Sequence, residues 1–281
     1  MPGIQQENET ILARLSSFLC ADPCAITPQA LSDMTAIGLS EEQAYLHLLS
    51  AWLELEPALW RRYLPRMLHR LSPADYNADP CLQTIRDAAG TSGSIVLREE
   101  NYAPCELFVA DDFMTDADGR VYPQLGWFRE GFSYPALMED GRIWMTVTPN
   151  EINTIRPCAQ QVHGKVLSYG LGLGYFAFHA LLNPRVDSVT VVERSENVIR
   201  LFREHLLPRF PRPDRLHIIQ ADAFDYAAHT APRERFDCVF TDLWHDVGDG
   251  LPLYRRMKAL EVPGPRYFYW IEKTMQAYLA D

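Results

Sequence analysis

Lys165-Val-Leu-Ser-Tyr-Gly-Leu-Gly-Leu-Gly-Tyr175 has the pattern of a buried strand followed by a glycine-rich turn. An apolar run leads into a loop with glycines at positions 170, 172 and 174, and a helical pattern follows. A second apolar run, Val189-Thr-Val-Val-Glu193, ends on a carboxylate about twenty residues beyond the glycines, as in nucleotide-binding βαβ units. The spacing therefore predicts two parallel strands, a connecting helix and a nucleotide site where the strands end.

The residue types in this loop suit a bound nucleoside. Gly170 can form the tight turn, while Gly172 and Gly174 let backbone approach a ligand and let the helix pack on the strand. The Glu193 carboxylate can accept hydrogen bonds from both hydroxyls of a ribose. Two alternatives stay open: the acids serve only as helix N-caps, or the glycines serve only close packing.

Two later apolar runs also end on acids. Residues 216–220 precede Asp222, and residues 236–241 precede Asp242. In an open α/β sheet, ligands bind beyond the carboxyl ends of the strands, so the three acids are expected at one edge of the sheet. From residue 164 onward strands and helices alternate, which predicts an α/β fold with a doubly wound, Rossmann-like parallel sheet.

The G-x-G-x-G spacing, with Tyr175 in place of the third glycine of a dinucleotide fingerprint, resembles the first motif of class I S-adenosylmethionine-dependent methyltransferases. The resemblance implies S-adenosyl-L-methionine as cofactor, with Asp222 near the adenine amino group and Asp242 facing the substrate. It implies a cofactor shell formed by Gly170, Leu171, Gly172, Gly174, Glu193, Asp222 and Ala223.

A second resemblance, over residues 95 to 272, is to spermidine synthases and their relatives, which place a hairpin with an aspartate-glycine turn ahead of such a sheet. Here Asp140-Gly141 occupies that place. Leu173 stands where those enzymes carry an acid, Trp144 stands where they carry a glutamine, and residues 242–246 lack their D-x-x-D-P spacing. We therefore predict methyl transfer to a small molecule, with aminopropyl transfer or non-catalytic nucleoside binding as alternatives.

Methyl transfer requires mainly that an acceptor be aligned with the methyl group and that water be removed. A base helps if the acceptor is an amine or hydroxyl. The candidates after the fourth strand of the sheet are Asp242, His245 and Asp246. Residues 148–151 are a candidate lid, and three tryptophans are candidate pocket walls or core residues: Trp127, Trp144 and Trp244.

Composition narrows the remaining possibilities. A net charge of −11 argues against general affinity for nucleic acid. The six cysteines show no C-x-x-C pair and no metal-ligand spacing. No signal peptide and no membrane span are expected. These features predict a cytoplasmic protein with a small-molecule partner and neither a nucleic acid nor a membrane partner.

The period of the apolar residues predicts three parts: a helical N-terminal module over 1–92, a small β-hairpin module over 93–150, and the Rossmann-like domain over 151–281. Thr91-Ser-Gly-Ser94 is expected to be a linker. A last helix is expected over 273–280, leaving no room for the final strand pair of most class I methyltransferases. The exposed sheet edge would need a cover, and homodimerisation is one possibility.

Overall fold

A computed structural model describes residues 3–279. Contacts between residues divide this part of the chain into two compact units, one formed by residues 3–76 and 101–133, the other by residues 77–100 and 134–279. The expected division of the chain into three parts, with boundaries near residues 92 and 150, stays a prediction. Within residues 3–279, no helix combines the length and apolar character needed to cross a membrane.

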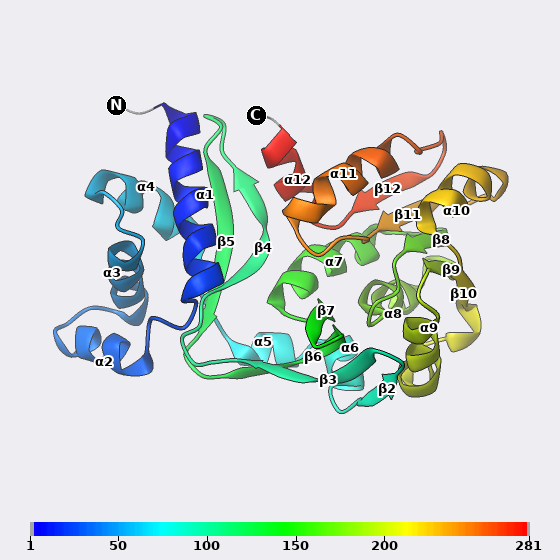
Figure 1. The fold of residues 1–281 in the computed structure, drawn as a ribbon, viewed down its shortest axis with the longest axis horizontal. Coiled ribbons are helices and arrows are strands. Elements are labelled where there is room, and N and C mark those ends of the chain that lie inside the picture. The colour runs from blue at the N-terminus through cyan, green and yellow to red at the C-terminus, as the bar shows by residue number, and fades with distance from the viewer. Residues whose placement is uncertain (1–2, 280–281) are drawn as a thin grey trace. The chain divides into compact units, whose positions relative to one another are not determined.

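The first unit combines helices with a three-stranded sheet of order β1-β5-β4 (Figure 1). The strand Leu68–Leu71 (β1) pairs in parallel with β5, and β4 pairs with β5 in antiparallel. The expectation that residues 1–92 are all helical is therefore wrong at β1, because its pairing partner lies more than fifty residues further along the chain. The other elements are α1 (Ile4–Ala21), α2 (Pro28–Ala36), α3 (Glu41–Trp52), α4 (Pro57–Met67), α5 (Pro73–Asn77), β4 (Phe108–Thr115) and β5 (Val121–Phe128).

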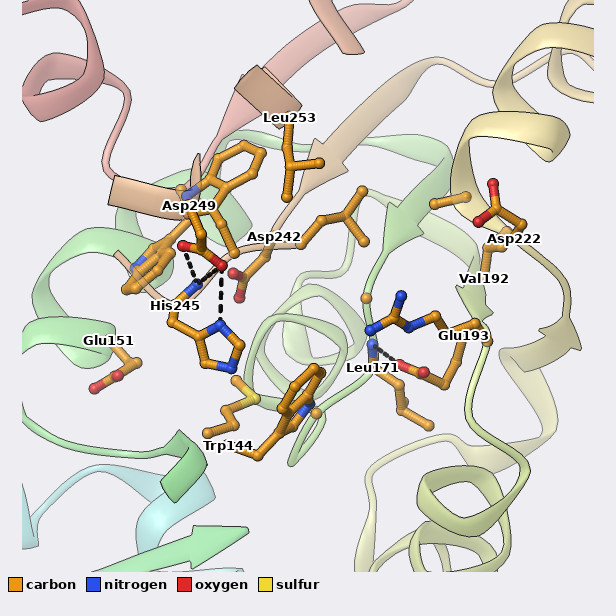
Figure 2. Close-up of a pocket in the computed structure, with 18 of the residues that line it drawn as sticks. Trp144, Glu151, Leu171, Val192, Glu193, Asp222, Asp242, His245, Asp249 and Leu253 are labelled. Atoms are coloured by element: carbon orange, nitrogen blue, oxygen red, sulfur yellow. Dashed lines mark hydrogen bonds and ion pairs between the residues drawn. The ribbon is translucent and has the colours of Figure 1, made fainter. Parts of the chain in front are cut away.

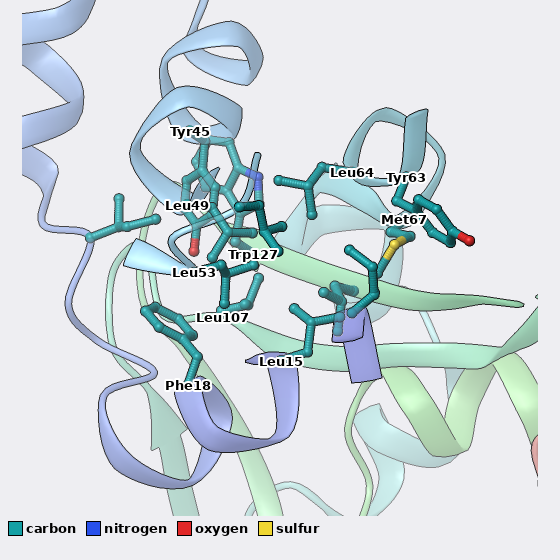
Figure 3. Close-up of a cluster of buried hydrophobic side chains, with 14 of the residues drawn as sticks. Leu15, Phe18, Tyr45, Leu49, Leu53, Tyr63, Leu64, Met67, Leu107 and Trp127 are labelled. Carbon is teal, nitrogen blue, oxygen red and sulfur yellow. The ribbon is translucent and has the colours of Figure 1, made fainter. Parts of the chain in front are cut away.

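An apolar core holds these helices to the sheet (Figure 3). The rings of Tyr45 in α3 and Trp127 in β5 stack with centroids 4.4 Å apart, and the Tyr45 hydroxyl donates to the Cys105 carbonyl at 2.9 Å. Trp127 is fully buried here, so it is a core residue and not the pocket wall that was the other interpretation. The capping box of Ser40 and Gln43 that the sequence predicts is confirmed at the start of α3.

A second sheet has the order β2-β3-β6-β7, and its β2–β3 and β6–β7 pairs are antiparallel. Thr91 pairs with Val96 across a tight turn, so Thr91–Ser94 is a hairpin and the linker prediction is wrong. The short strand formed there is stabilised by cross-strand hydrogen bonds that local composition does not reveal. The strands are β2 (Gly90–Ser92), β3 (Ile95–Tyr102), β6 (Phe132–Glu139) and β7 (Arg142–Thr146).

The five-stranded sheet has the order β10-β9-β8-β11-β12, and every strand pair within it is parallel. Figure 1 shows these strands side by side. This is the doubly wound, Rossmann-like α/β architecture predicted from the sequence, with the order reversing at β8 between its neighbours β9 and β11. The strands are β8 (Gly164–Tyr169), β9 (Val186–Glu193), β10 (Leu216–Gln220), β11 (Cys238–Thr241) and β12 (Arg266–Tyr269).

Helices connect these strands and cover the sheet. The expected helices after β8, β9, β10 and β11 are all present. The expected final helix, which follows β12, begins at Glu272. Ala280, the expected end of that helix, lies outside the described residues. The helices of this unit are α6 (Pro80–Ile85), α7 (Pro149–Gln161), α8 (Tyr175–Leu182), α9 (Glu196–Leu201, continued by a π turn over Phe202–Leu206), α10 (Ala223–His229), α11 (Val247–Lys258) and α12 (Glu272–Leu279), with 3-10 turns at Leu207–Arg209, Pro213–Arg215 and Ala231–Arg233.

A buried polar cluster ties α6 to α8. The Asp79 side chain is 1% exposed, caps α6 through the amides of Cys81 and Leu82, and accepts a 2.8 Å hydrogen bond from the Tyr175 hydroxyl. His179 Nε2 lies 3.2 Å from the same carboxylate. Burial raises the pKa of Asp79, but the hydrogen bonds and the His179 contact outweigh it, so the pKa is lowered. The cluster fixes the helix that follows the glycine loop.

Candidate functional site

A pocket opens at the carboxyl edge of the five-stranded sheet, where β8, β9, β10 and β11 end (Figure 2). Its volume is about 350 Å³, within the range of small-molecule sites. Glu193 and Asp222 lie at one end, and Glu151, His245 and Asp249 lie at the other. The site therefore sits where the strand order reverses, which is the place that the fold predicts for a ligand.

The glycine loop between β8 and α8 is held against the end of β11. Gly170 has φ +93°, and a Cβ at this position would lie 2.0 Å from the carbonyl oxygen of Asp242. Only glycine permits both the conformation and the approach. Gly174, with φ +76°, begins α8, and a Cβ there would meet the rings of Phe202 and Phe210. Gly174 serves helix packing and does not line the pocket, whereas Gly170, Leu171 and Gly172 do.

Glu193, at the end of β9, links this strand to the glycine loop through a hydrogen bond. One carboxylate oxygen accepts the Leu171 amide at 3.1 Å and the other accepts the Ser195 amide at 2.8 Å. Figure 2 shows the bond to Leu171 at the wall of the pocket. A carboxylate oxygen accepts more than one hydrogen bond, so Glu193 keeps the capacity to accept from a ligand hydroxyl. The sequence placed this acid beside the glycines, and the structure brings them into contact.

Asp222 caps a helix and also lies at the pocket. Its carboxylate caps α10 by accepting the amides of Phe224 at 2.8 Å and Asp225 at 3.0 Å. It also lines the pocket, together with Ala223 and Phe224. The Phe224 ring carries the guanidinium of Arg256 3.8 Å from its centroid. An aromatic ring backed by a cation is a suitable wall for a planar ligand group.

Glu151 and Asp242 place two carboxyl groups at the pocket wall. Glu151 accepts hydrogen bonds from the Thr146 hydroxyl at 3.0 Å and from the amide and hydroxyl of Thr148, which begins α7 with a capping box. Burial still raises the pKa of Glu151. Burial, and then the charge of Glu151, raises the pKa of Asp242 to about 8. Asp242 is therefore largely protonated at neutral pH, and a cation beside it would favour the ionised form.

His245 is oriented by an acid that the sequence interpretation missed. Asp249 Oδ2 lies 3.0 Å from His245 Nδ1, and Asp249 also accepts the backbone amides of His245 and Asp246. Burial raises the pKa of Asp249, but these bonds outweigh it and lower the pKa. The His245 ring meets Trp144 edge-on, with centroids 4.5 Å apart. The i, i+4 spacing of His245 and Asp249 at the start of α11 was the signal available in the sequence.

Asp246, the third predicted catalytic candidate, does not line the pocket. It is the exposed N-cap of α11 and accepts the amides of Gly248 at 2.6 Å and Asp249 at 3.4 Å. Its carboxylate is thereby engaged in helix capping. We assign it a structural role, and we propose Asp242 and His245 as the functional members of the predicted trio.

Tryptophan side chains form much of the remaining wall. Trp144, Trp244 and Trp270 all line the pocket. The indole N–H of Trp270 donates to the Thr154 hydroxyl at 3.0 Å, whereas the buried N–H of Trp244 has no hydrogen-bond partner among residues 3–279. Arg194 carries its guanidinium 5.8 Å from the Trp144 ring centroid. Over the same residues, no group of three or more His, Cys, Asp or Glu side chains could hold a metal ion.

Two solved structures are similar to parts of this chain. No protein-family model and no curated protein match the chain. Among solved structures, a candidate SAM-dependent methyltransferase from Streptococcus mutans is 18% identical with a TM-score of 0.35, covering 46% of this chain and 36% of that one. The precorrin-8w decarboxylase of Methanobacterium thermoautotrophicum is 17% identical with a TM-score of 0.30, covering 40% and 57%. The matched part of this chain therefore spans less than two thirds of either protein.

Proposed function

We propose that this protein is an S-adenosylmethionine-dependent methyltransferase that acts on a small molecule. The observation that carries the proposal is one continuous pocket with two chemically different ends. At one end Glu193 binds the amide of Leu171 in the glycine loop, and at the other His245 is oriented by Asp249. The first arrangement suits a nucleoside, and the second suits removal of a proton from an acceptor.

The residues present fit an adenosyl cofactor. Glu193 offers carboxylate oxygens to ribose hydroxyls, and Asp222 and Phe224 offer an acid and an aromatic face to a base. Asp242 lines the same pocket as these residues and lies on the His245 side of Glu193 and Asp222 (Figure 2). When bound, the cofactor would supply a methyl group already activated by its positive sulfur. A sulfonium near Asp242 would be matched by the carboxylate form of that residue.

The residues of the chain then have distinct tasks in methyl transfer. Asp249 holds Nδ1 of His245, which leaves Nε2 as the proton acceptor. At this end of the pocket His245 would take the proton from the hydroxyl or amine of an acceptor that receives the methyl group. Trp144, Trp244 and Trp270 give this part of the pocket a largely apolar wall.

The likeness to spermidine synthases defines the second candidate. Those enzymes carry an acid in the glycine loop for the cofactor amino group, whereas Leu173 here is apolar and fully buried. A cation needs a paired carboxylate when it is desolvated, so Leu173 argues for methyl rather than aminopropyl transfer. The acidic lining of the pocket keeps aminopropyl transfer as an alternative for testing. Cytoplasmic localisation and dimerisation stay predictions.

Isothermal titration calorimetry of the protein with four ligands tests the proposal: S-adenosylmethionine, S-adenosylhomocysteine, decarboxylated S-adenosylmethionine and NAD. We expect micromolar binding of the first two, about −8 kcal/mol, and none of NAD. Tighter binding of the decarboxylated form would favour aminopropyl transfer. Binding of none would remove the cofactor assignment. With binding established, an acceptor panel is assayed for S-adenosylhomocysteine, whose absence throughout would favour a non-catalytic binding protein.

A further inference from the structure

Met145 of β7 lies directly on the glycine loop. Its thioether sulfur accepts the backbone amide of Leu173 at 3.2 Å. A Cβ added to Gly172 would lie only 1.6 Å from the same sulfur, so the sulfur sits against the backbone of that glycine. Gly172 and Met145 both line the pocket. The methionine therefore fills space beside the glycine loop. It also pairs with a backbone amide that such a loop otherwise offers to a ligand.

The contact is easily exchanged. A thioether is a weak acceptor, so an oxygen of a ligand would pair better with the Leu173 amide. Methionine has three rotatable bonds and adapts to alternative packing at small cost. Nothing covalent and no charge pairing holds the Met145 side chain at the loop. The closed arrangement can thus be favoured in the absence of a ligand and still yield to one.

β7 is the strand of its sheet best placed to move. It forms one edge and, among residues 3–279, pairs only with β6, across an irregular register between Leu137 and Met138. The opposite edge is fixed, because Arg200 donates to the Ser92 hydroxyl at 2.8 Å and Gly90 packs against the ring of His205. Withdrawal of β7 from the loop therefore needs no movement of β2 or α9.

The same strand also carries Trp144, which contacts two other parts of the site. Its ring meets His245 edge-on at 4.5 Å and lies under the Arg194 guanidinium at 5.8 Å. One strand thus touches the glycine loop, the residue after Glu193 and the oriented histidine. A shift of β7 would change access to the nucleoside end and the packing of His245 together.

We infer that Met145 closes the glycine loop and that ligand admission requires its withdrawal with β7. The inference rests on the proposed function for the identity of the ligand, an adenosyl compound at the glycine loop. In the closed state the Leu173 amide donates to the Met145 sulfur and is not available to a ligand. The fraction of protein molecules able to bind the ligand is therefore reduced. Apparent affinity falls by the same fraction. Removing the methionine side chain should therefore tighten binding.

The test compares S-adenosylhomocysteine affinity of the full chain and three variants by calorimetry. Met145→Ala should bind roughly three- to tenfold more tightly than the wild type. Met145→Leu, which keeps the bulk and loses the sulfur acceptor, should fall between them. Arg142→Ala, an exposed position of the same strand outside the pocket, is the matched control and should equal the wild type. Circular dichroism melts identify any variant that fails to fold.

A second readout needs no ligand. Amide hydrogen exchange at Leu173 should be at least about fivefold faster in Met145→Ala, because the amide loses its acceptor. Unchanged exchange would overturn the contact itself. Equal or weaker affinity in Met145→Ala, with the wild type still binding, would overturn the inference and leave the proposed function standing. Binding by neither protein would overturn both. Detectable binding only in the alanine variant would support both.

Discussion

The imidazole of His245 and the carboxylate of Asp249 lie one helical turn apart, with Nδ1 and Oδ2 separated by 3.0 Å. Asp249 is itself fixed, since it accepts two backbone amides at the start of α11. The histidine side chain is 42% exposed and its ring is held edge-on by Trp144. A carboxylate that selects one tautomer and fixes the ring is the usual support for a histidine base.

We expect Asp249→Asn to lower kcat of methyl transfer roughly 10- to 100-fold, because the histidine loses the acid that orients it. The KM values for cofactor and acceptor should stay within about twofold, since Asp249 acts through His245. Steady-state kinetics at fixed pH measure the split. Glu204→Gln, an exposed acid beside His205, is the control. A rise in KM with unchanged kcat would contradict the positioning role.

Glu193→Ala should weaken S-adenosylhomocysteine binding by about two to three orders of magnitude. The variant removes the acceptor of ribose hydroxyls and leaves the Leu171 amide without its partner. Glu193→Gln keeps one acceptor oxygen at the loop and should lose less. Calorimetry of both variants gives the ratio. Retained affinity in Glu193→Ala would show that the nucleoside lies elsewhere.

The raised pKa of Asp242, about 8, makes stability depend on pH. The unfolded chain titrates this group near pH ~4. The folded state therefore binds the proton more tightly, and this contribution is fully present below pH ~4 and lost as pH rises through about 8. Asp242→Asn mimics the protonated form at every pH. Between pH 5 and 9, we expect the wild type to lose roughly 2 kcal/mol more stability than this variant.

Urea unfolding at three pH values checks the Asp242 prediction. Parallel stability profiles of wild type and Asp242→Asn would mean that solvent in the pocket neutralises the effect of burial. The ionisation of Asp242 should also affect ligand binding, because a cationic ligand near Asp242 favours the ionised form of this residue.

S-Adenosylmethionine carries a positive sulfur that S-adenosylhomocysteine lacks. If the sulfonium lies near Asp242, the affinity ratio of the two ligands should shift toward S-adenosylmethionine by about fivefold between pH 6.5 and 9. The reason is that Asp242 becomes ionised over this interval. Parallel calorimetric titrations measure the ratio. In Asp242→Asn the ratio should not change with pH, and a persistent change there would assign the effect to another group.

Asp79→Ala should destabilise the fold by about 3–5 kcal/mol. The substitution removes the cap of α6 and leaves the Tyr175 hydroxyl and His179 without their shared acceptor in a buried site. Asp79→Asn keeps an acceptor oxygen and should cost less. Chemical denaturation gives both values. Equal stability of Asp79→Ala and wild type would indicate that the cluster contributes nothing net.

The local pattern of the sequence determined the five-stranded sheet, because apolar runs of strand length alternate with helical periods over residues 164–279. It also placed Glu193, Asp222 and Asp242 at strand ends, since parallel strands bring their carboxyl ends to one edge. The glycine spacing determined the loop. These properties depend on residues close in sequence and on a rule of topology, so they can be derived without coordinates.

Which side chains meet in the site depends on contacts between segments that are distant in the sequence. Met145 contacts Gly172 and Leu173 from a different sheet, and the charge of Glu151, 91 residues earlier in the chain, adds to burial in raising the pKa of Asp242. The strand β1 forms inside a helical stretch because it pairs with β5. Since β5 is remote in sequence, the local pattern did not indicate this strand. Such pairings depend on packing between distant segments, and no local period records them. Glu193, Asp222 and Asp242 were thus visible in the sequence, whereas Asp249, the partners of these acids and their charge states required the fold.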